Sequence, residues 1–236
     1  MMGNREYGLS FQLYEARKER NAGVTIVLYH GWGGSVGNYR DLASVLADKG
    51  FTVIIPELTY HNSRNPINHF QKCVLQTYFW KTIGESIDEF HELMEVASLI
   101  NEKTIVVGSS MGGFIANGIF AMHPDLKGLV NINGSGSFVL SENLFREQDQ
   151  RSEITSSEKD YLNHYDPILK GCGDGAILLM HGANDQTVSM RGQKDYYDHL
   201  IHTRGKKNSK LVIYENVNHE FTPTMEEALL HWLGEM

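Results

Sequence analysis

The stretch Thr104-Ile105-Val106-Val107-Gly108-Ser109-Ser110-Met111-Gly112-Gly113 decides the fold prediction. A short apolar run ends at Val107, and the pattern G-x-S-x-G follows at once, beginning at Gly108. The run predicts a strand buried on both faces, because its apolar residues are continuous rather than alternating. An apolar period over 111–122, which Pro124 terminates, predicts a helix directly afterwards. The motif is therefore placed at a strand-to-helix turn.

The serine at the centre of this motif predicts a nucleophile. A sharp strand-to-helix turn forces the residue into a strained backbone conformation and projects its hydroxyl above the sheet. Glycines flank it because a Cβ at those positions would collide with the neighbouring strand and helix. The Ser110 hydroxyl would then lie at a helix N-terminus, whose dipole favours developing negative charge. For the pentapeptide taken alone, a Gly/Ser-rich turn without chemistry is the alternative.

Two candidate partners of the serine follow later apolar runs. Asp185 comes just past the run over 176–180, and His219 comes just past the run over 210–214. The carboxyl ends of parallel strands meet at one edge of a sheet, where sites in open α/β sheets form. The chain order of nucleophile, acid and histidine predicts that Asp185 orients the imidazole of His219, which takes the proton of Ser110.

Other acids and histidines fit these roles less well. Asp174 and Asp195 are rival acids, but neither falls immediately beyond a predicted strand. His181 closes a strand and is interpreted as structural. His199 and His202 are spaced i, i+3 on a predicted helix and lack a third ligand, so they are expected on a solvated face rather than at a metal.

A glycine-rich loop, His30-Gly31-Trp32-Gly33-Gly34-Ser35, follows the first core strand. Acyl transfer needs two preorganised N–H donors for the oxyanion, and glycines let the backbone approach a carbonyl closely. The backbone N–H groups of Trp32 and of Met111, the residue after the serine, are the predicted donors. A phosphate-cradling loop or a plain turn is the alternative, although the spacing does not match the G-x-G-x-x-G of a dinucleotide fold. His30 is interpreted as a hydrogen-bonded loop residue.

The rest of the chain alternates between short apolar runs and helical periods. This alternation predicts a mostly parallel, doubly wound α/β sheet in a single domain over 1–236. The stretch from Tyr7 to Glu15 alternates in polarity and predicts an N-terminal edge strand. Core strands are expected at 24–29, 51–55, 104–107, 129–132, 176–180 and 210–214, and helices at 39–49, 80–97, 111–122, 190–201 and 225–233.

Two long stretches do not fit a minimal strand–helix unit, and such stretches are usually functional. The first, over 57–78, is polar and rich in His and Asn. The second, over 136–175, carries a capping-box pattern and apolar residues interspersed with charges, which predicts a small helical cap above the site. A surface excursion unrelated to substrate is the alternative. Tyr60, Leu144 and Phe145 are the predicted substrate-binding residues, and the Tyr78-Phe79-Trp80 segment is a further candidate.

These motifs together resemble those of the α/β-hydrolase family, over nearly the whole chain from Val24 to Leu233. Small size and the His-Gly-x-x-Asp segment are similar to bacterial serine esterases related to dienelactone hydrolases and prolyl-oligopeptidase catalytic domains. Dienelactone hydrolases use a cysteine nucleophile, so Ser110 favours ordinary esters. The resemblance implies hydrolysis of carboxylic esters through an acyl-enzyme. A thioesterase or peptidase with the same triad is the alternative, followed by a catalytically silent binding protein.

Composition narrows the class of partner. The 236 residues carry 21 Lys and Arg against 29 Asp and Glu, a net charge of −8, which argues against nucleic acid or an anionic membrane surface. The two cysteines, Cys73 and Cys172, and the lack of an apolar leader predict a cytoplasmic protein. Neither a metal site nor a cofactor is expected, and the expected partner is a small-molecule ester. The oligomeric state stays open.

Overall fold

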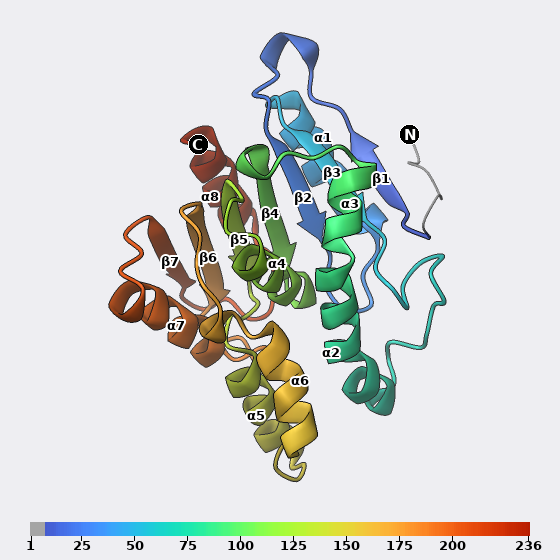
Figure 1. Ribbon diagram of the computed structural model, residues 1–236, viewed down its shortest axis with the longest axis vertical. Helices are drawn as coiled ribbons and strands as arrows, with labels where there is room; N and C mark the ends of the chain where they lie inside the picture. Colours follow the sequence, from blue (N-terminus) through green and yellow to red (C-terminus); the bar gives the residue numbers. More distant parts are fainter. Residues whose placement is uncertain (1–7) are drawn as a thin grey trace.

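A computed structural model describes residues 8–236, so Tyr7, the first residue of the expected edge strand, lies outside the described residues. Within this range seven strands form one sheet in the order β1-β3-β2-β4-β5-β6-β7 (Figure 1). β1 runs antiparallel to β3, and all other neighbouring strands are parallel, which confirms the predicted sheet. The strands are β1 (Phe11–Tyr14), β2 (Thr25–Tyr29), β3 (Thr52–Pro56), β4 (Thr104–Ser109), β5 (Gly128–Ile132), β6 (Ala176–Gly182) and β7 (Ser209–Tyr214).

Helices cover both faces of the sheet (Figure 1). One face packs against α1 (Arg40–Asp48) and α8 (Pro223–Gly234). The other face packs against α2 (Lys72–Asp88), α3 (Phe90–Val96), α4 (Met111–Met122) and α7 (Met190–Asp198). Short helical turns complete the connections at η1 (Lys18–Arg20), η2 (Val36–Tyr39), η3 (Asn101–Lys103), η4 (Pro167–Leu169) and η5 (His199–Thr203).

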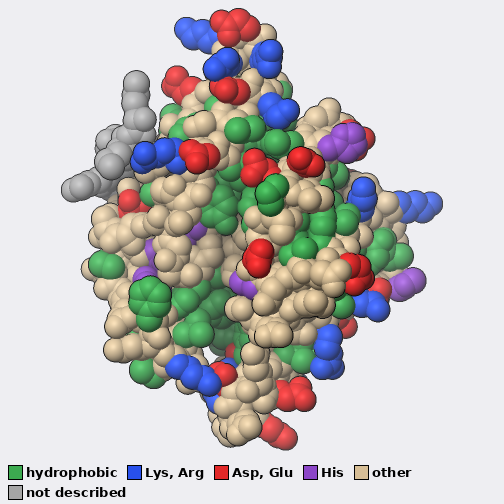
Figure 2. Space-filling view, turned by 180° about the vertical axis from the view of Figure 1, so that it is seen from behind, with side chains coloured by type: hydrophobic (Ala, Val, Ile, Leu, Met, Phe, Trp, Pro, Cys, Tyr) green, Lys and Arg blue, Asp and Glu red, His purple; other side chains and the backbone are tan. Residues whose placement is uncertain are grey.

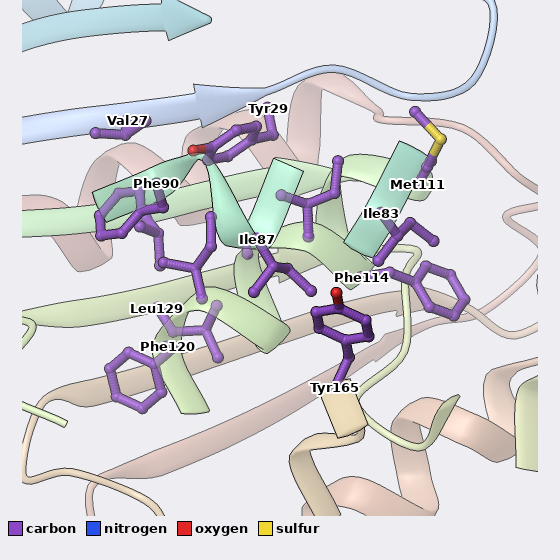
Figure 3. Packing of buried hydrophobic residues seen from close by; sticks show 14 of the residues in the cluster. Val27, Tyr29, Ile83, Ile87, Phe90, Met111, Phe114, Phe120, Leu129 and Tyr165 are labelled. Atoms are coloured by element: carbon purple, nitrogen blue, oxygen red, sulfur yellow. The ribbon is translucent and has the colours of Figure 1, made fainter. Parts of the chain in front are cut away.

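Strand side chains alternate between these two layers, which explains why the core strands are apolar throughout. In β2, Val27 and Tyr29 belong to the cluster under α2 and α4, whereas Ile26 and Leu28 belong to the cluster under α1 and α8. Burial on both faces therefore requires an apolar residue at every position. Figure 3 shows part of the first cluster, including residues from β2, α2, α4 and α6.

The helix expected over 80–97 is two helices, and the first begins earlier than predicted. α2 starts at Lys72, inside the stretch interpreted as a polar loop. The pattern does not reveal this start, because the first turns of the helix expose polar side chains to solvent. Glu89 separates α2 from α3, and its carboxylate binds the guanidinium of Arg64 at 2.5 Å and 2.9 Å. The early start matters for function, since the first half of α2 faces the site described below.

The predicted cap segment contains α5 (Phe138–Asp149) and α6 (Ser156–Tyr165), which lie below the carboxyl ends of the strands in Figure 1. Thr155 and Glu158 form the predicted capping box, with the Glu158 N–H donating to Thr155 Oγ1 at 3.3 Å and the Thr155 N–H to Glu158 Oε2 at 2.9 Å. Arg146 joins the two helices, because its guanidinium contacts both Glu142 and Glu158 at 2.6 Å.

The surface carries charges of both signs. Figure 2 shows acidic and basic side chains interspersed over the face turned away from the view of Figure 1. Across residues 8–236, no helix combines the length and the apolar character that crossing a membrane requires.

Candidate active site

Ser110 occupies the turn between β4 and α4 in a strained conformation. Its φ of 57° and ψ of −124° lie in a region that non-glycine residues rarely adopt. The backbone holds this conformation, because the Ser110 N–H donates to the Ile132 carbonyl and its carbonyl accepts from the Gly113 N–H, both at 2.8 Å. A Cβ on Gly112 would collide with the Tyr29 carbonyl. The tight turn therefore fixes the serine hydroxyl above the sheet.

The three predicted catalytic side chains are in contact. Oγ of Ser110 lies 2.8 Å from Nε2 of His219, and Nδ1 of His219 lies 2.6 Å from Oδ2 of Asp185. An ionised carboxylate only accepts hydrogen bonds, so Nδ1 carries the proton and Nε2 faces Ser110 with its lone pair. The rival acids lie elsewhere: Asp195 accepts from Ser137 Oγ at 2.8 Å, and the Asp174 carbonyl accepts from Asn208.

The side chain of Asp185 is fully buried, and both of its carboxylate oxygens accept hydrogen bonds. Its Oδ1 accepts from the backbone N–H groups of Thr187 and Val188 at 2.9 Å, and its Oδ2 also lies 3.2 Å from Nε2 of His181. Burial by itself would raise the pKa of Asp185, but the hydrogen bonds from His181 and His219 hold that pKa well below its ordinary value. The acid is therefore ionised at neutral pH.

His181 was expected to be structural, and the structure places it against the acid as well. The side chain is fully buried on β6, and Nε2 also contacts the Val188 carbonyl at 2.9 Å. Sequence reasoning missed the contact with Asp185. The available signal is the spacing of four residues across the end of a strand, which lets the chain turn back on itself.

The glycine-rich loop lies directly against the serine. A Cβ on Gly31 would stand 3.0 Å from Cβ and 3.5 Å from Oγ of Ser110, so a side chain at this position would press directly on the serine. Trp32 follows Gly31 and lines the same cavity as Ser110. Met111 begins α4, and the first N–H groups of a helix have no intrahelical acceptor. The two predicted oxyanion donors thus belong to segments that border the serine.

Three histidines pack behind this loop. The ring of His61 lies 5.1 Å from that of His30, 4.1 Å from that of His69 and 5.5 Å from that of Trp32, measured between centroids. Burial lowers the pKa of both His30 and His61 to about 4, so both rings are neutral at pH 7. Nδ1 of His30 contacts the Gly31 carbonyl at 2.9 Å. Within residues 8–236, no three His, Cys, Asp or Glu side chains are arranged to hold a metal ion.

Ser110 and His219 open into a cavity of about 540 Å³. Its lining includes both apolar and polar side chains, which suits a ligand that has both kinds of group. The apolar side chains are those of Trp32, Leu75, Phe79, Trp80, Phe145, Val188 and Phe221, and the polar ones include those of Gln76, Glu142, Gln148, Asp149, Arg151, Gln186 and Thr187.

Of the three predicted substrate-binding residues, the structure brings only Phe145 into this cavity. Tyr60 does not line it, because its side chain packs against α2, where its hydroxyl donates to Glu85 at 2.9 Å and its ring packs on Tyr78. Its backbone φ is 64°. Leu144 does not line it either, since it lies one position off the face of α5 that carries Glu142 and Phe145. Phe79 and Trp80 of the further candidate segment do line the cavity.

Comparison with known proteins identifies the fold family. A family model described as the alpha/beta hydrolase fold matches residues 24–153. The chain is 28% identical over 218 residues to a protein named esterase YjfP from Escherichia coli (strain K12), covering 86% of this chain and 85% of that protein. It is 24% identical over 242 residues to the putative esterase YitV of Bacillus subtilis (strain 168), covering 95% and 94%.

A solved structure shows the same fold over almost the full length. Thermogutta terrifontis esterase 2, phosphoramylated by tabun, matches with a TM-score of 0.68 at 16% identity, covering 99% of this chain and 91% of that one. The family match itself extends over more than half of the 236 residues and includes both the glycine-rich loop and the serine turn. The resemblance seen in the sequence is confirmed, and the chain belongs to the α/β-hydrolase fold family.

Proposed function

We propose that this protein is a serine hydrolase that cleaves carboxylic esters through an acyl-enzyme. One observation carries the proposal: the hydrogen-bond chain from Asp185 through His219 to Ser110, which ends at a cavity of about 540 Å³. A serine hydroxyl is a weak nucleophile at neutral pH and needs an adjacent base, which in turn needs an orienting acid. Ser110, His219 and Asp185 provide the nucleophile, the base and the orienting acid in that order.

The reaction uses each group in turn. Oγ of Ser110 attacks the ester carbonyl carbon while Nε2 of His219 takes the hydroxyl proton. The carbonyl oxygen becomes an oxyanion that accepts hydrogen bonds from the N–H groups of Trp32 and Met111. Each such donor typically contributes about 10²–10³ to the rate. His219 then protonates the departing alcohol, and a water molecule, deprotonated by the same nitrogen, hydrolyses the acyl-enzyme.

The relatives support an ester as the substrate. Two proteins that cover most of this chain are named as an esterase and a putative esterase. A thioesterase or peptidase is the second candidate, since the same three side chains also attack thioesters and amides. The cavity size suits a small molecule, and α5 contributes Glu142, Phe145 and Asp149 to its lining.

Labelling with a fluorophosphonate tests the proposal directly. The wild-type protein should incorporate one phosphonate at Ser110, found by peptide mass spectrometry, and should release p-nitrophenol from p-nitrophenyl butyrate in a burst. Ser110→Ala should lose both while keeping its melting temperature. Ser44→Ala is the matched control, because Ser44 is exposed on α1 and bonds only the Arg40 carbonyl.

The same assays separate the two candidate functions. The protein would be a thioesterase or peptidase if its kcat/KM for butyryl-CoA or for an aminoacyl p-nitroanilide were above that for the ester. A wild-type protein that resists labelling, or a Ser110→Ala variant that hydrolyses esters normally, would contradict the mechanism itself.

A further inference from the structure

The glycine-rich loop is fixed from behind by a histidine that the mechanism above does not use. The Gly33 N–H donates to Nε2 of His61 at 3.1 Å, and Nδ1 of His61 lies 2.9 Å from the Thr59 carbonyl. A single tautomer satisfies both contacts, with the proton on Nδ1 and the lone pair of Nε2 facing Gly33. His61 is completely buried, so water does not compete for either contact.

A second contact fixes the same loop through the indole of Trp32. Nε1 of Trp32 donates to the His69 carbonyl at 3.0 Å, and the indole ring packs edge-on against the rings of His61 and His69. Both acceptors come from the polar stretch over 57–78, in which the sequence assigns no role to His61 or His69. Trp32, which carries the proposed oxyanion donor, is therefore anchored twice. Its side chain is held by His69, and the peptide that follows it is held by His61.

The backbone at this point depends on such anchoring. Gly33 has a φ of 68°, in the left-handed region, and glycine populates several backbone conformations with similar ease. The Gly34 N–H donates to the Gly31 carbonyl at 3.0 Å and closes a turn whose central peptide joins Trp32 and Gly33. Without an acceptor for the Gly33 N–H, this turn would lose the contact that sets the orientation of its central peptide. The Trp32 N–H belongs to the same turn, so a change in the conformation of the turn would shift this N–H as well.

We propose that His61 is a positioning residue for ester hydrolysis: its neutral Nε2 holds the Gly33 N–H and thereby keeps the Trp32 N–H directed at the oxyanion above Ser110. The inference rests on the proposed function. His61 touches neither the substrate nor the reacting atoms and acts through the loop. Since catalysis draws on donors that are oriented before the reaction, loss of this orientation should lower kcat rather than raise KM.

The test compares substitutions that keep or remove the acceptor. His61→Gln places an amide oxygen near the position of Nε2, whereas His61→Met and His61→Ala offer no comparable acceptor. We expect His61→Gln to keep kcat within about threefold, and the acceptor-free variants to lose roughly 10- to 100-fold in kcat with little change in KM. His123→Ala is the matched control, because His123 is half-buried, packs on Phe90 and lies at the far end of α4.

A transition-state analogue distinguishes orientation from general destabilisation. A trifluoromethyl ketone forms an oxyanion on the serine, so its affinity should fall in parallel with kcat/KM in the acceptor-free variants. All rates are referred to the number of sites that a fluorophosphonate titrates. Equal kcat in wild-type and acceptor-free proteins, or equal losses in His61→Gln and His61→Met, would overturn the proposal.

Two further outcomes are decisive. If neither His61→Met nor His61→Ala folds, the proposal is overturned, because His61 would then support the fold and not the loop alone. Failure of the proposed function has a different signature, since the wild-type protein would not be labelled at Ser110. A labelled, active wild type beside an equally active His61→Ala would reject only the role of His61.

Discussion

His181 and Asp185 are in contact at the end of β6, with Nε2 of His181 3.2 Å from Oδ2 of Asp185. The same oxygen lies 2.6 Å from Nδ1 of His219, so one carboxylate oxygen faces two imidazoles. Backbone N–H groups occupy the other oxygen. The contacts with His181 and with the backbone N–H groups fix the plane of the carboxylate independently of His219, and the hydrogen bonds from both histidines keep the acid ionised.

Asp185→Asn should therefore reduce turnover severely without unfolding the protein. An amide in this position presents an N–H to Nδ1 or leaves it without a strong acceptor, which favours the wrong tautomer of His219. The loss in kcat should approach about 10⁴-fold, as in triads where only the acid is changed. Steady-state kinetics on p-nitrophenyl butyrate, with thermal unfolding as the folding control, measure the effect. A loss below about tenfold would contradict the role of Asp185.

Stability should fall as the pH is lowered, because of the buried histidines. The pKa of His61 is lowered from an ordinary value of 6.5 to about 4, so the unfolded chain binds a proton in this interval that the native protein does not. The contribution of His61 leaves the free energy of unfolding at its full value above about pH 6.5. It lowers that free energy progressively as the pH falls towards 4. His30 contributes in the same direction.

Urea unfolding at several pH values tests this expectation. His61→Gln removes one titrating group, so its free energy of unfolding should depend less steeply on pH between about 6.5 and 4, by close to one proton. His91→Gln is the matched control, because His91 is exposed on α3. Identical slopes for wild type and His61→Gln would show that His61 titrates normally.

Gly112→Ala should destabilise the protein through the serine turn. The added Cβ would overlap the backbone carbonyls of Tyr29 and His30, which cannot move without shifting β2. Overpacking of this kind typically costs about 1–3 kcal/mol, and more where backbone must yield. Gly37→Ala is the control, since its Cβ would meet only Ser35 Oγ at 3.5 Å. Equal melting temperatures for the two variants would contradict the tight packing of the turn.

The sequence predicted the parts of the fold and site that depend on local pattern. Continuous apolar strands require burial on both faces, and the carboxyl ends of parallel strands meet at one edge. These two rules predict that Ser110, Asp185 and His219 lie close together at that edge. Each of the three lies within a few residues of a strand end, so small errors in strand boundaries did not matter.

The parts that escaped prediction depend on packing between distant segments. His61 reaches Gly33 across 28 positions, and no periodicity connects a polar loop with a glycine-rich one. Tyr60 has a backbone conformation that aromatic residues rarely adopt, and its side chain packs against α2 instead of lining the cavity. The early start of α2 was hidden because its first turns are solvated, so their apolar residues, including Leu75, form no regular stripe.

The two neighbouring apolar residues of α5 should behave differently when truncated. Phe145 lines the cavity and packs against Phe79 and Trp80, with ring centroids 5.7 Å and 6.5 Å apart, whereas Leu144 lies off this face. Phe145→Ala should enlarge the space beside the serine and shift the preferred p-nitrophenyl ester from short towards longer acyl chains. Leu144→Ala should leave the profile unchanged and is thus a matched control on the same helix. Both variants are tested by their rates of hydrolysis of p-nitrophenyl esters from acetate to octanoate, together with their melting temperatures. A changed chain-length preference in both variants would mean that α5 moves as a whole. An unchanged preference in both would contradict a role of α5 in binding the acyl chain.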